Sequence, residues 1–169
     1  MIVSAHDGYP RLLRSGADFI EVDIRRDANQ QIVLAHDEPR PGETLPTLDE
    51  ALDNIGESGL HLDLKEAGFE RELLTRVLRK LAPHRVVATP DFEESVRTIK
   101  RHFPEVRVSP IDFVAVDREK FGQYNGHGPI WVWTVDEKRA MKRYMKDGRV
   151  EAIITNRPDL ALKLRKARS

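Results

Sequence analysis

Short apolar runs alternate with longer amphipathic stretches along the chain, and each run has the length of a β-strand. Strands that alternate with helices are typical of parallel α/β proteins. Eight runs share the 169 residues, which leaves about 21 residues for each strand and its connection. This is the tight minimum for a compact (β/α)8 TIM-type barrel, and we expect one such domain over residues 1–169. The runs cover residues 2–6, 19–24, 32–36, 60–65, 86–89, 106–109, 130–135 and 152–155.

Helix signals fill most of the gaps between the runs. Thr47 is followed three positions later by Glu50, and Asp91 by Glu94, which is the spacing of a capping box at the start of a helix. Asp136 precedes another amphipathic stretch and is expected to cap that helix. These residues therefore predict where three of the helices begin.

Two connections do not fit a regular barrel. Only residues 25–31 separate the second and third runs, which is too few for a crossover helix, so this return is expected to be extended along the barrel flank. Residues 39–46 form a proline-rich loop soon after His36 and Asp37. We therefore expect a short, irregular connection between strands two and three.

Charge and composition narrow the class of function. The chain holds 28 Lys and Arg against 28 Asp and Glu, so it lacks the basic excess that binding to nucleic acid requires. It contains no cysteine, which leaves carboxylate, imidazole and carbonyl groups to hold any metal. Neither a leader-like start nor a run of ~20 apolar residues occurs. We expect a cytoplasmic protein with no nucleic-acid partner and no stable membrane insertion.

Ionisable residues interrupt the first four apolar runs near their carboxyl ends, where TIM-type barrels carry their active sites. Because strand side chains alternate between two faces, Glu21 and Asp23 share a face, as do Asp63 and Lys65. A single strand-end histidine is commonly structural, and an Asp-x-Lys pair is commonly an ion pair. Six such residues at one end indicate a site instead. They are His6, Glu21, Asp23, His36, Asp63 and Lys65.

The chemistry of this set points to a metal and an anionic substrate. Three carboxylates at one barrel mouth repel one another unless they take up protons or a cation. Oxygen ligands without thiolates suit a hard divalent ion, so Glu21, Asp23 and Asp63 are candidate ligands of Mg²⁺ or Ca²⁺. The two histidines have side chains suited to acid and base catalysis near neutral pH. Lys65 supplies a positive charge for an anionic group.

Trp133 and Asn156 each have two possible roles. Trp131 and Trp133 lie two apart on one strand, and Trp133 either packs in the core or lines the substrate site. Asn156 either hydrogen-bonds substrate or caps the helix that begins near Pro158. No chemistry is assigned to the remaining histidines, which are His61, His84, His102 and His127.

Four motifs occur in order along the chain: His6-Asp7-Gly8, Glu21-Val22-Asp23, His36-Asp37 and Asp63-Leu64-Lys65. They resemble the His-Arg-Gly, Glu-x-Asp, His-Asp and Glu-x-Lys hallmarks of the glycerophosphodiester phosphodiesterase family. Residues 45–52, 132–136 and 152–159 are similar to that family's Pro-Thr-Leu-Glu-Glu helix entry, its Trp-Thr-Val-Asn strand, and its last strand and helix. The resemblance covers nearly the whole chain in the family's order.

The resemblance implies metal-dependent cleavage of a small-molecule glycerophosphodiester, or a related phospholipid headgroup, to glycerol phosphate and an alcohol. A substrate hydroxyl would attack its own phosphorus to give a cyclic phosphate, which water then opens. Carried over by position, the metal ligands are Glu21, Asp23 and Asp63, the general acid and base are His6 and His36, the phosphate contact is Lys65, and the substrate site includes Trp133.

The chain departs from the family's pattern in several places. Asp7 replaces the usual Arg, the Pro-Glu-Asn-Thr segment is missing, and the insertion after the second histidine is reduced to the loop at residues 38–45. Asp63 replaces the usual Glu, as in sphingomyelinase D-type phospholipases, which are similar in reading Asp-x-Lys. We therefore expect an open site. The substrate, the metal and the oligomeric state stay open.

Two rival functions follow from the same residues. One is a non-catalytic barrel that only binds phosphate or metal, although retention of both histidines and all three carboxylates favours the enzyme. The other is an isomerase or lyase acting on a sugar phosphate, which would need a glycine-rich phosphate loop after strands seven and eight. Residues 155–158 are not glycine-rich. A metal-dependent phosphodiester hydrolase is therefore the expected function.

Overall fold

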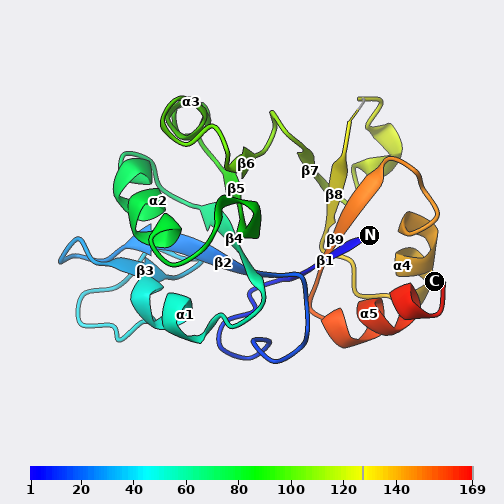
Figure 1. The fold of residues 1–169 in the computed structure, drawn as a ribbon, viewed down its shortest axis with the longest axis horizontal. Coiled ribbons are helices and arrows are strands. Elements are labelled where there is room, and N and C mark those ends of the chain that lie inside the picture. The colour runs from blue at the N-terminus through cyan, green and yellow to red at the C-terminus, as the bar shows by residue number, and fades with distance from the viewer. Residues whose placement is uncertain (127, 169) are drawn as a thin grey trace.

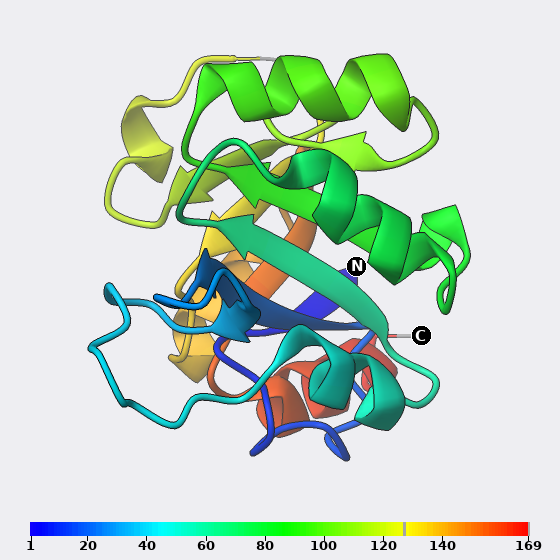
Figure 2. The same cartoon turned by 90° about the vertical axis from the view of Figure 1, so that its left-hand side faces the viewer.

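The computed structural model describes residues 1–126 and 128–168, which form one curled sheet with helices on its outer side (Figures 1 and 2). Eight strands of this part of the chain run parallel in the order β6-β5-β4-β2-β1-β9-β8-β7, and β3 pairs with β2. The strands are β1 (Ile2–Ala5), β2 (Phe19–Arg26), β3 (Ile32–Leu34), β4 (Gly59–Leu64), β5 (Val86–Pro90), β6 (Arg107–Val108), β7 (Val114–Asp117), β8 (Ile130–Trp133) and β9 (Val150–Thr155).

The sheet is a TIM-like half-barrel, which confirms the predicted fold class, and it is open on one side. Within the described ranges no ladder of hydrogen bonds joins β6 to β7, and these two strands form the edges of the sheet (Figure 1). Strands from both ends of the chain lie at its centre, because β1 pairs with both β2 and β9. The carboxyl ends of the parallel strands therefore meet at one mouth.

The eight apolar runs include one strand that does not belong to the barrel. The run at 32–36 forms β3, which pairs antiparallel with the end of β2, with Arg26 opposite Ile32. The Asp27 carboxylate accepts hydrogen bonds from the backbone N–H groups of Asn29 and Gln31, so residues 25–31 form a hairpin rather than an extended return along the flank. The prediction of a barrel strand at 32–36 was wrong, because the five-residue turn at 27–31 returns the chain antiparallel to β2 and needs no crossover.

The eighth barrel strand is β7, which the apolar pattern did not indicate. Its sequence is Val-Ala-Val-Asp, and it pairs with β8 along its whole length. Four residues with only two large apolar side chains give too short a pattern to distinguish a strand from a loop.

Helices cover the outer face only where a connection is long enough. None of the described residues forms a helix between β1 and β2 or between β6 and β7. Because these connections need no helix, a short chain is long enough for the eight parallel strands. No described helix combines the length and the apolar character that crossing a bilayer requires. The helices are α1 (Leu48–Asn54), α2 (Glu70–Leu78), α3 (Glu93–His102), α4 (Lys138–Tyr144) and α5 (Pro158–Lys166), with short 3-10 turns η1 (Pro83–Arg85) and η2 (Phe121–Gln123).

The predicted helix caps have different outcomes. Thr47 and Glu50 form a complete capping box at α1, which confirms that prediction. The prediction for Asp91 was wrong, because α3 has Phe92 at its N-cap with no side-chain cap, and the Asp91 carboxylate lies 4.0 Å from Lys65 instead.

Asp136 is also not a helix cap. The N-cap of α4 is Glu137, which makes no side-chain capping bond. Asp136 instead accepts hydrogen bonds from the Thr155 hydroxyl and from the backbone and side-chain amides of Asn156. Both Asp91 and Asp136 precede a helix and were therefore predicted to cap it. Each instead contacts residues at the carboxyl ends of the barrel strands.

Alternation along β2 divides the apolar core from the barrel interior. Ile20, Val22 and Ile24 are buried in the main core under the helices, whereas Glu21 and Asp23 point to the other face. A smaller aromatic cluster fills the barrel interior around Trp131, which is fully buried. The carboxylates therefore have an apolar layer on one side and the barrel mouth on the other.

Candidate active site

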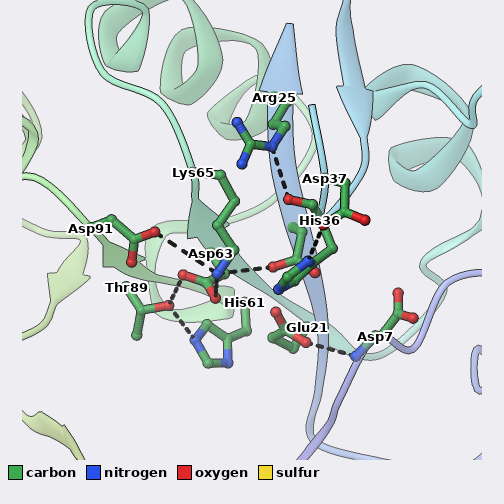
Figure 3. Close-up of polar contacts among 11 residues, drawn as sticks. Asp7, Glu21, Arg25, His36, Asp37, His61, Asp63, Lys65, Thr89 and Asp91 are labelled. Carbon is green, nitrogen blue, oxygen red and sulfur yellow. Dashed lines mark hydrogen bonds and ion pairs between the residues drawn. The ribbon is translucent and has the colours of Figure 1, made fainter. Parts of the chain in front are cut away.

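All the predicted site residues except Asn156 line one cavity at the barrel mouth. The cavity has a volume of about 400 Å³ and is lined by residues at the carboxyl ends of several barrel strands and of β3. Figure 3 shows how most of these side chains converge from neighbouring strands. The ionisable lining residues are His6, Glu21, Asp23, His36, His61, Asp63, Lys65 and Asp91.

Three carboxylates form the floor of this cavity. Strand β2 contributes Glu21 and Asp23, and β4 contributes Asp63, which lies opposite Asp23 in the register of the two strands. One oxygen from each of the three lies within 4.8 Å of the others. Glu21 is only 3% exposed and Asp23 only 7%, so bulk water provides little screening between them.

The electrostatics of this floor favour a cation. Burial, and next the charge of Asp23, raise the pKa of Glu21 well above its usual value, against the hydrogen bond from the Asp7 backbone N–H. Burial also raises the pKa of Asp23, although the neighbouring Lys65 lowers it. Buried carboxylates with raised pKa values favour protonation or a bound cation. The all-oxygen donor set fits a hard divalent ion such as Mg²⁺ or Ca²⁺.

Lys65 compensates only part of this negative charge. Its Nζ lies 2.7 Å from Oδ2 of Asp63, 3.3 Å from Oδ1 of Asp23 and 4.0 Å from Oδ2 of Asp91. Burial alone would lower the pKa of Lys65, but the hydrogen bond and charge of Asp63 raise it further than burial lowers it. One ammonium group therefore faces four carboxylates when Glu21 is included, so an added cation is favourable.

His6 is held by a chain of polar contacts from the last strand. Its Nδ1 lies 3.1 Å from Oδ1 of Asn156, and Nδ2 of Asn156 donates to Oδ2 of Asp136 at 2.9 Å. Since the Asp136 carboxylate only accepts, the amide NH₂ faces Asp136 and the amide oxygen faces His6. Nδ1 of His6 therefore carries the proton, and Nε2 is left for other partners. Asn156 touches His6 and is not among the residues that line the cavity.

The charge of Asp136 is stabilised at this position. Burial would raise its pKa, but hydrogen bonds from Asn156 and from the Thr155 hydroxyl hold the pKa below its usual value. An ionised Asp136 keeps the Asn156 amide in the orientation that the His6 ring requires.

His36 occupies the open side of the mouth. It follows β3, and its Nδ1 lies 2.9 Å from Oδ1 of Asp37, while Nε of Arg25 donates to its backbone oxygen. The hydrogen bond from His36 lowers the pKa of Asp37. The His36 side chain is 76% exposed, which agrees with the open site expected from the short loop at residues 38–45.

A tight turn after β1 brings Asp7 to the edge of the site. A side chain at Gly8 would approach the Ala5 carbonyl and Ile20 to 2.9 Å, so only glycine allows the chain to turn there. The backbone N–H of Asp7 donates to Oε2 of Glu21 at 2.6 Å, as Figure 3 shows. The Asp7 side chain is exposed and does not line the cavity. In this structure the residue acts on Glu21 mainly through its backbone.

The structure corrects the prediction for His61. It was assigned no chemistry, yet it lines the cavity and contacts Thr89, which also lines it. Period-two spacing from Asp63 and Lys65 already places position 61 on the inward face, and this signal could have found it. His84 lies in η1 and His102 at the end of α3, away from the cavity, and His127 lies outside the described residues.

The two tryptophans have different environments. Trp131 is fully buried and packs against Phe113, with ring centroids 4.6 Å apart. Trp133 is 41% exposed and lines the cavity. The structure therefore separates a core tryptophan from one at the mouth.

Comparisons of sequence and of fold with known proteins both find glycerophosphodiester phosphodiesterases. No family model matches the chain. A glycerophosphodiester phosphodiesterase of Caldanaerobacter subterraneus subsp. tengcongensis is 22% identical over 217 aligned positions, which cover 92% of this chain and 89% of the relative. The alignment is longer than the 169 residues of this chain, so the relative carries insertions that this chain lacks.

Solved structures share the fold over nearly their whole length. A glycerophosphodiester phosphodiesterase of Parabacteroides distasonis superposes with a TM-score of 0.83 at 21% identity, covering 99% of this chain and 97% of its own. A phosphodiesterase of Oleispira antarctica in complex with the product sn-glycerol-3-phosphate gives 0.72 at 17% identity, covering 98% and 97%. With four motifs at the mouth of the half-barrel, the chain is therefore similar to glycerophosphodiester phosphodiesterases in both sequence and fold.

Proposed function

We propose that the chain is a metal-dependent phosphodiester hydrolase that acts on glycerophosphodiesters or related phospholipid headgroups. The observation that carries this proposal is the convergence of three carboxylates, Lys65 and two histidines in one open cavity. Phosphoryl transfer needs positive charge near the phosphoryl oxygens and a path for protons at the attacking and leaving oxygens. This cavity offers side chains for both needs.

Glu21, Asp23 and Asp63 are the residues that would hold the divalent ion. When bound, Mg²⁺ or Ca²⁺ supplies positive charge that stabilises the phosphoryl oxygens. Lys65 adds a second positive charge beside the same carboxylates, within 2.7 Å of Asp63. We assign it to the substrate phosphate, with Trp133 as an apolar wall for the rest of the substrate.

His6 and His36 are assigned to the two proton transfers. One imidazole takes the proton of the attacking substrate hydroxyl as its oxygen bonds to phosphorus, and the other gives a proton to the alcohol that leaves as the second P–O bond breaks. Water then opens the cyclic phosphate to glycerol phosphate. The contact of His6 with Asn156 supports this role, because it leaves Nε2 available.

An apolar rim supports substrates that carry an apolar portion. Phe92, Ile111 and Trp133 are exposed large hydrophobic side chains, and they lie at or just after the carboxyl ends of β5, β6 and β8. Phe92 follows Asp91 and Ile111 follows Pro110, both of which line the cavity. Grouped exposed apolar side chains mark binding sites more often than single ones do. A lysophospholipid fits this rim better than glycerophosphocholine does.

Hydrolysis measured by ³¹P NMR tests the proposal. Pure protein with Mg²⁺ or Ca²⁺ should convert glycerophosphocholine, lysophosphatidylcholine or a chromogenic phosphodiester, and EDTA should stop the reaction. Phe92→Ser with Ile111→Ser should lower kcat/KM for lysophosphatidylcholine more than for glycerophosphocholine. A protein that binds the metal and phosphate but turns over none of these esters would instead be the non-catalytic binding barrel.

A further inference from the structure

A chain of hydrogen bonds runs from the buried Ser4 to the carboxylate of Asp63. Oγ of Ser4 lies 3.1 Å from Nδ1 of His61, and Nε2 of His61 lies 3.1 Å from Oγ1 of Thr89. Oγ1 of Thr89 donates to Oδ1 of Asp63, also at 3.1 Å. Figure 3 shows the Thr89 hydroxyl joined by dashed lines to both His61 and Asp63. Ser4 is fully buried and His61 is 1% exposed, whereas Thr89 and Asp63 are partly exposed at the cavity.

The direction of each bond follows from what the groups can donate. An ionised Asp63 only accepts, so the single hydroxyl proton of Thr89 is directed to it. The Thr89 oxygen then has only lone pairs to offer His61, and Nε2 of His61 must donate. In a neutral ring Nδ1 is left without a proton and accepts from the Ser4 hydroxyl.

We propose that His61 is a positioning residue, which through Thr89 fixes the orientation of Asp63 as a ligand of the divalent ion. This inference rests on the metal site of the proposed function and adds to it two residues that do not touch the metal. Ligands of bound metals commonly need such supporting contacts to hold their orientation.

The surroundings make Asp63 rigid from both sides. Thr89 occupies Oδ1, and Nζ of Lys65 donates to Oδ2 at 2.7 Å. The carboxylate cannot rotate without breaking one of these bonds. Asp63 and Thr89 are opposite each other in the register of β4 and β5, so the backbone already sets their spacing.

The His61 ring is itself held by packing. Trp131 meets it edge-on, with ring centroids 5.3 Å apart and an angle of 85° between the rings. Trp131 in turn donates through Nε1 to the Glu151 carboxylate. The imidazole therefore has one orientation, with Nε2 directed to Thr89 and away from the aromatic cluster.

The tautomer of His61 is the first test, and it requires no activity. Nitrogen-15 NMR of the imidazole groups in the metal-free protein, with His61→Gln to assign the signal, should show a proton on Nε2 of His61. A ring protonated at Nδ1 alone would overturn the proposal.

Metal affinity is the second test, with Mn²⁺ as the probe in titration calorimetry of the full chain. Thr89→Val should weaken Mn²⁺ binding by about 10-fold to 100-fold, as loss of a supporting contact commonly does. Thr89→Ser keeps the hydroxyl and should keep the affinity. Ser95→Ala is the matched control, because it removes a buried hydroxyl bond to the Glu70 carboxylate outside the cavity and should lower the melting temperature without changing Mn²⁺ affinity.

The outcomes separate this proposal from the proposed function. A wild-type chain that binds no Mn²⁺ overturns the metal site and the positioning role together. A wild-type chain that binds Mn²⁺, combined with unchanged affinity in Thr89→Val, overturns the positioning role alone.

Discussion

Each histidine at the mouth has its Nδ1 engaged by an oxygen of a neighbouring side chain, Asn156 for His6 and Asp37 for His36. This arrangement directs the two Nε2 atoms away from those partners. The two rings differ in environment, because the partner of His6 is anchored to Asp136 whereas His36 and Asp37 are exposed. The orientation of His6 is therefore set by the fold, and that of His36 by a local contact.

Replacement of either mouth histidine should slow catalysis without unfolding the protein. His6→Ala and His36→Ala should each lower kcat by roughly 10² or more if the ring transfers a proton in the transition state. His102→Ala, on the exposed end of α3, is the control and should keep normal turnover. Steady-state kinetics with circular dichroism decides, and near-normal kcat in either mouth variant removes that histidine from the mechanism.

Asp7 replaces the arginine of the family's pattern, and its side chain is directed to solvent. Asp7→Arg should keep the backbone hydrogen bond to Glu21 and add a cation that can reach the phosphate. We expect KM to fall by about tenfold, the value of one charge-assisted contact. Asp7→Asn is the control that removes charge alone. An unchanged KM with a lowered melting temperature would show that residue 7 has a structural role only.

The site residues were predictable to the extent that strand alternation and local motifs specify them. Glu21, Asp23 and Asp63 needed only period-two spacing and parallel strands to be placed together. The contact of His6 with Asn156 joins residues 150 positions apart, and no local pattern indicates it. Asp136 was misread because an acidic residue before a helix has the same local signal whether it caps the helix or holds a neighbouring strand end.

At the level of secondary-structure elements, a partly exposed ion pair connects the edge strand β6 to β9. Nη2 of Arg107 donates to Oε2 of Glu151 at 2.7 Å, and Trp131 of β8 donates to the same oxygen. Burial would raise the pKa of Glu151, but the hydrogen bonds from Arg107 and Trp131 lower it below its usual value. This contact ties one edge of the open sheet to its centre.

The lowered pKa of Glu151 predicts a pH-dependent contribution to stability. A carboxyl group with a lower pKa in the folded state stabilises the fold above its unfolded pKa, and this contribution is lost as the pH falls through the folded pKa. Glu151→Gln should therefore cost about 1 kcal/mol at pH 7, after allowance for partial exposure. Urea unfolding at pH 7 and pH 3 measures it, with Glu93→Gln as the exposed control. An equal loss at both pH values would contradict the assignment.

The alternation of apolar runs and helical stretches predicted the fold class, but it did not predict the roles of two strands, β3 and β7. β3 has the apolar character of a barrel strand and belongs to a hairpin, because β2 continues past its neighbours and turns back on itself. β7 has too few apolar residues to stand out, and its pairing with β8 makes it a strand. The apolar pattern of a strand indicates that its side chains are buried, but it does not indicate which neighbouring strand it pairs with.

For the whole molecule, the short connections between strands affect the shape of the site. The relative from Caldanaerobacter aligns over more positions than this chain possesses, and the half-barrel lacks described helices after β1 and β6. What remains is the mouth, where the carboxylates, Lys65 and the two histidines line one cavity. The reduced scaffold keeps the residues that the proposed chemistry needs and leaves the cavity open beside His36.

In the proposed function, the carboxylates of Glu21, Asp23 and Asp63 form a divalent-cation site, with the first two buried and Asp63 partly exposed. Titration of the metal-free protein with Mg²⁺, Ca²⁺ or Mn²⁺ in a calorimeter tests it most directly. We expect one binding site and, at a metal concentration of about 100 times Kd, a gain of about 2.7 kcal/mol in the free energy of unfolding. Glu21→Gln should weaken binding and remove most of this gain. If no divalent ion binds, or if Glu21→Gln binds the ion and is stabilised like the wild type, these carboxylates are not a divalent-cation site.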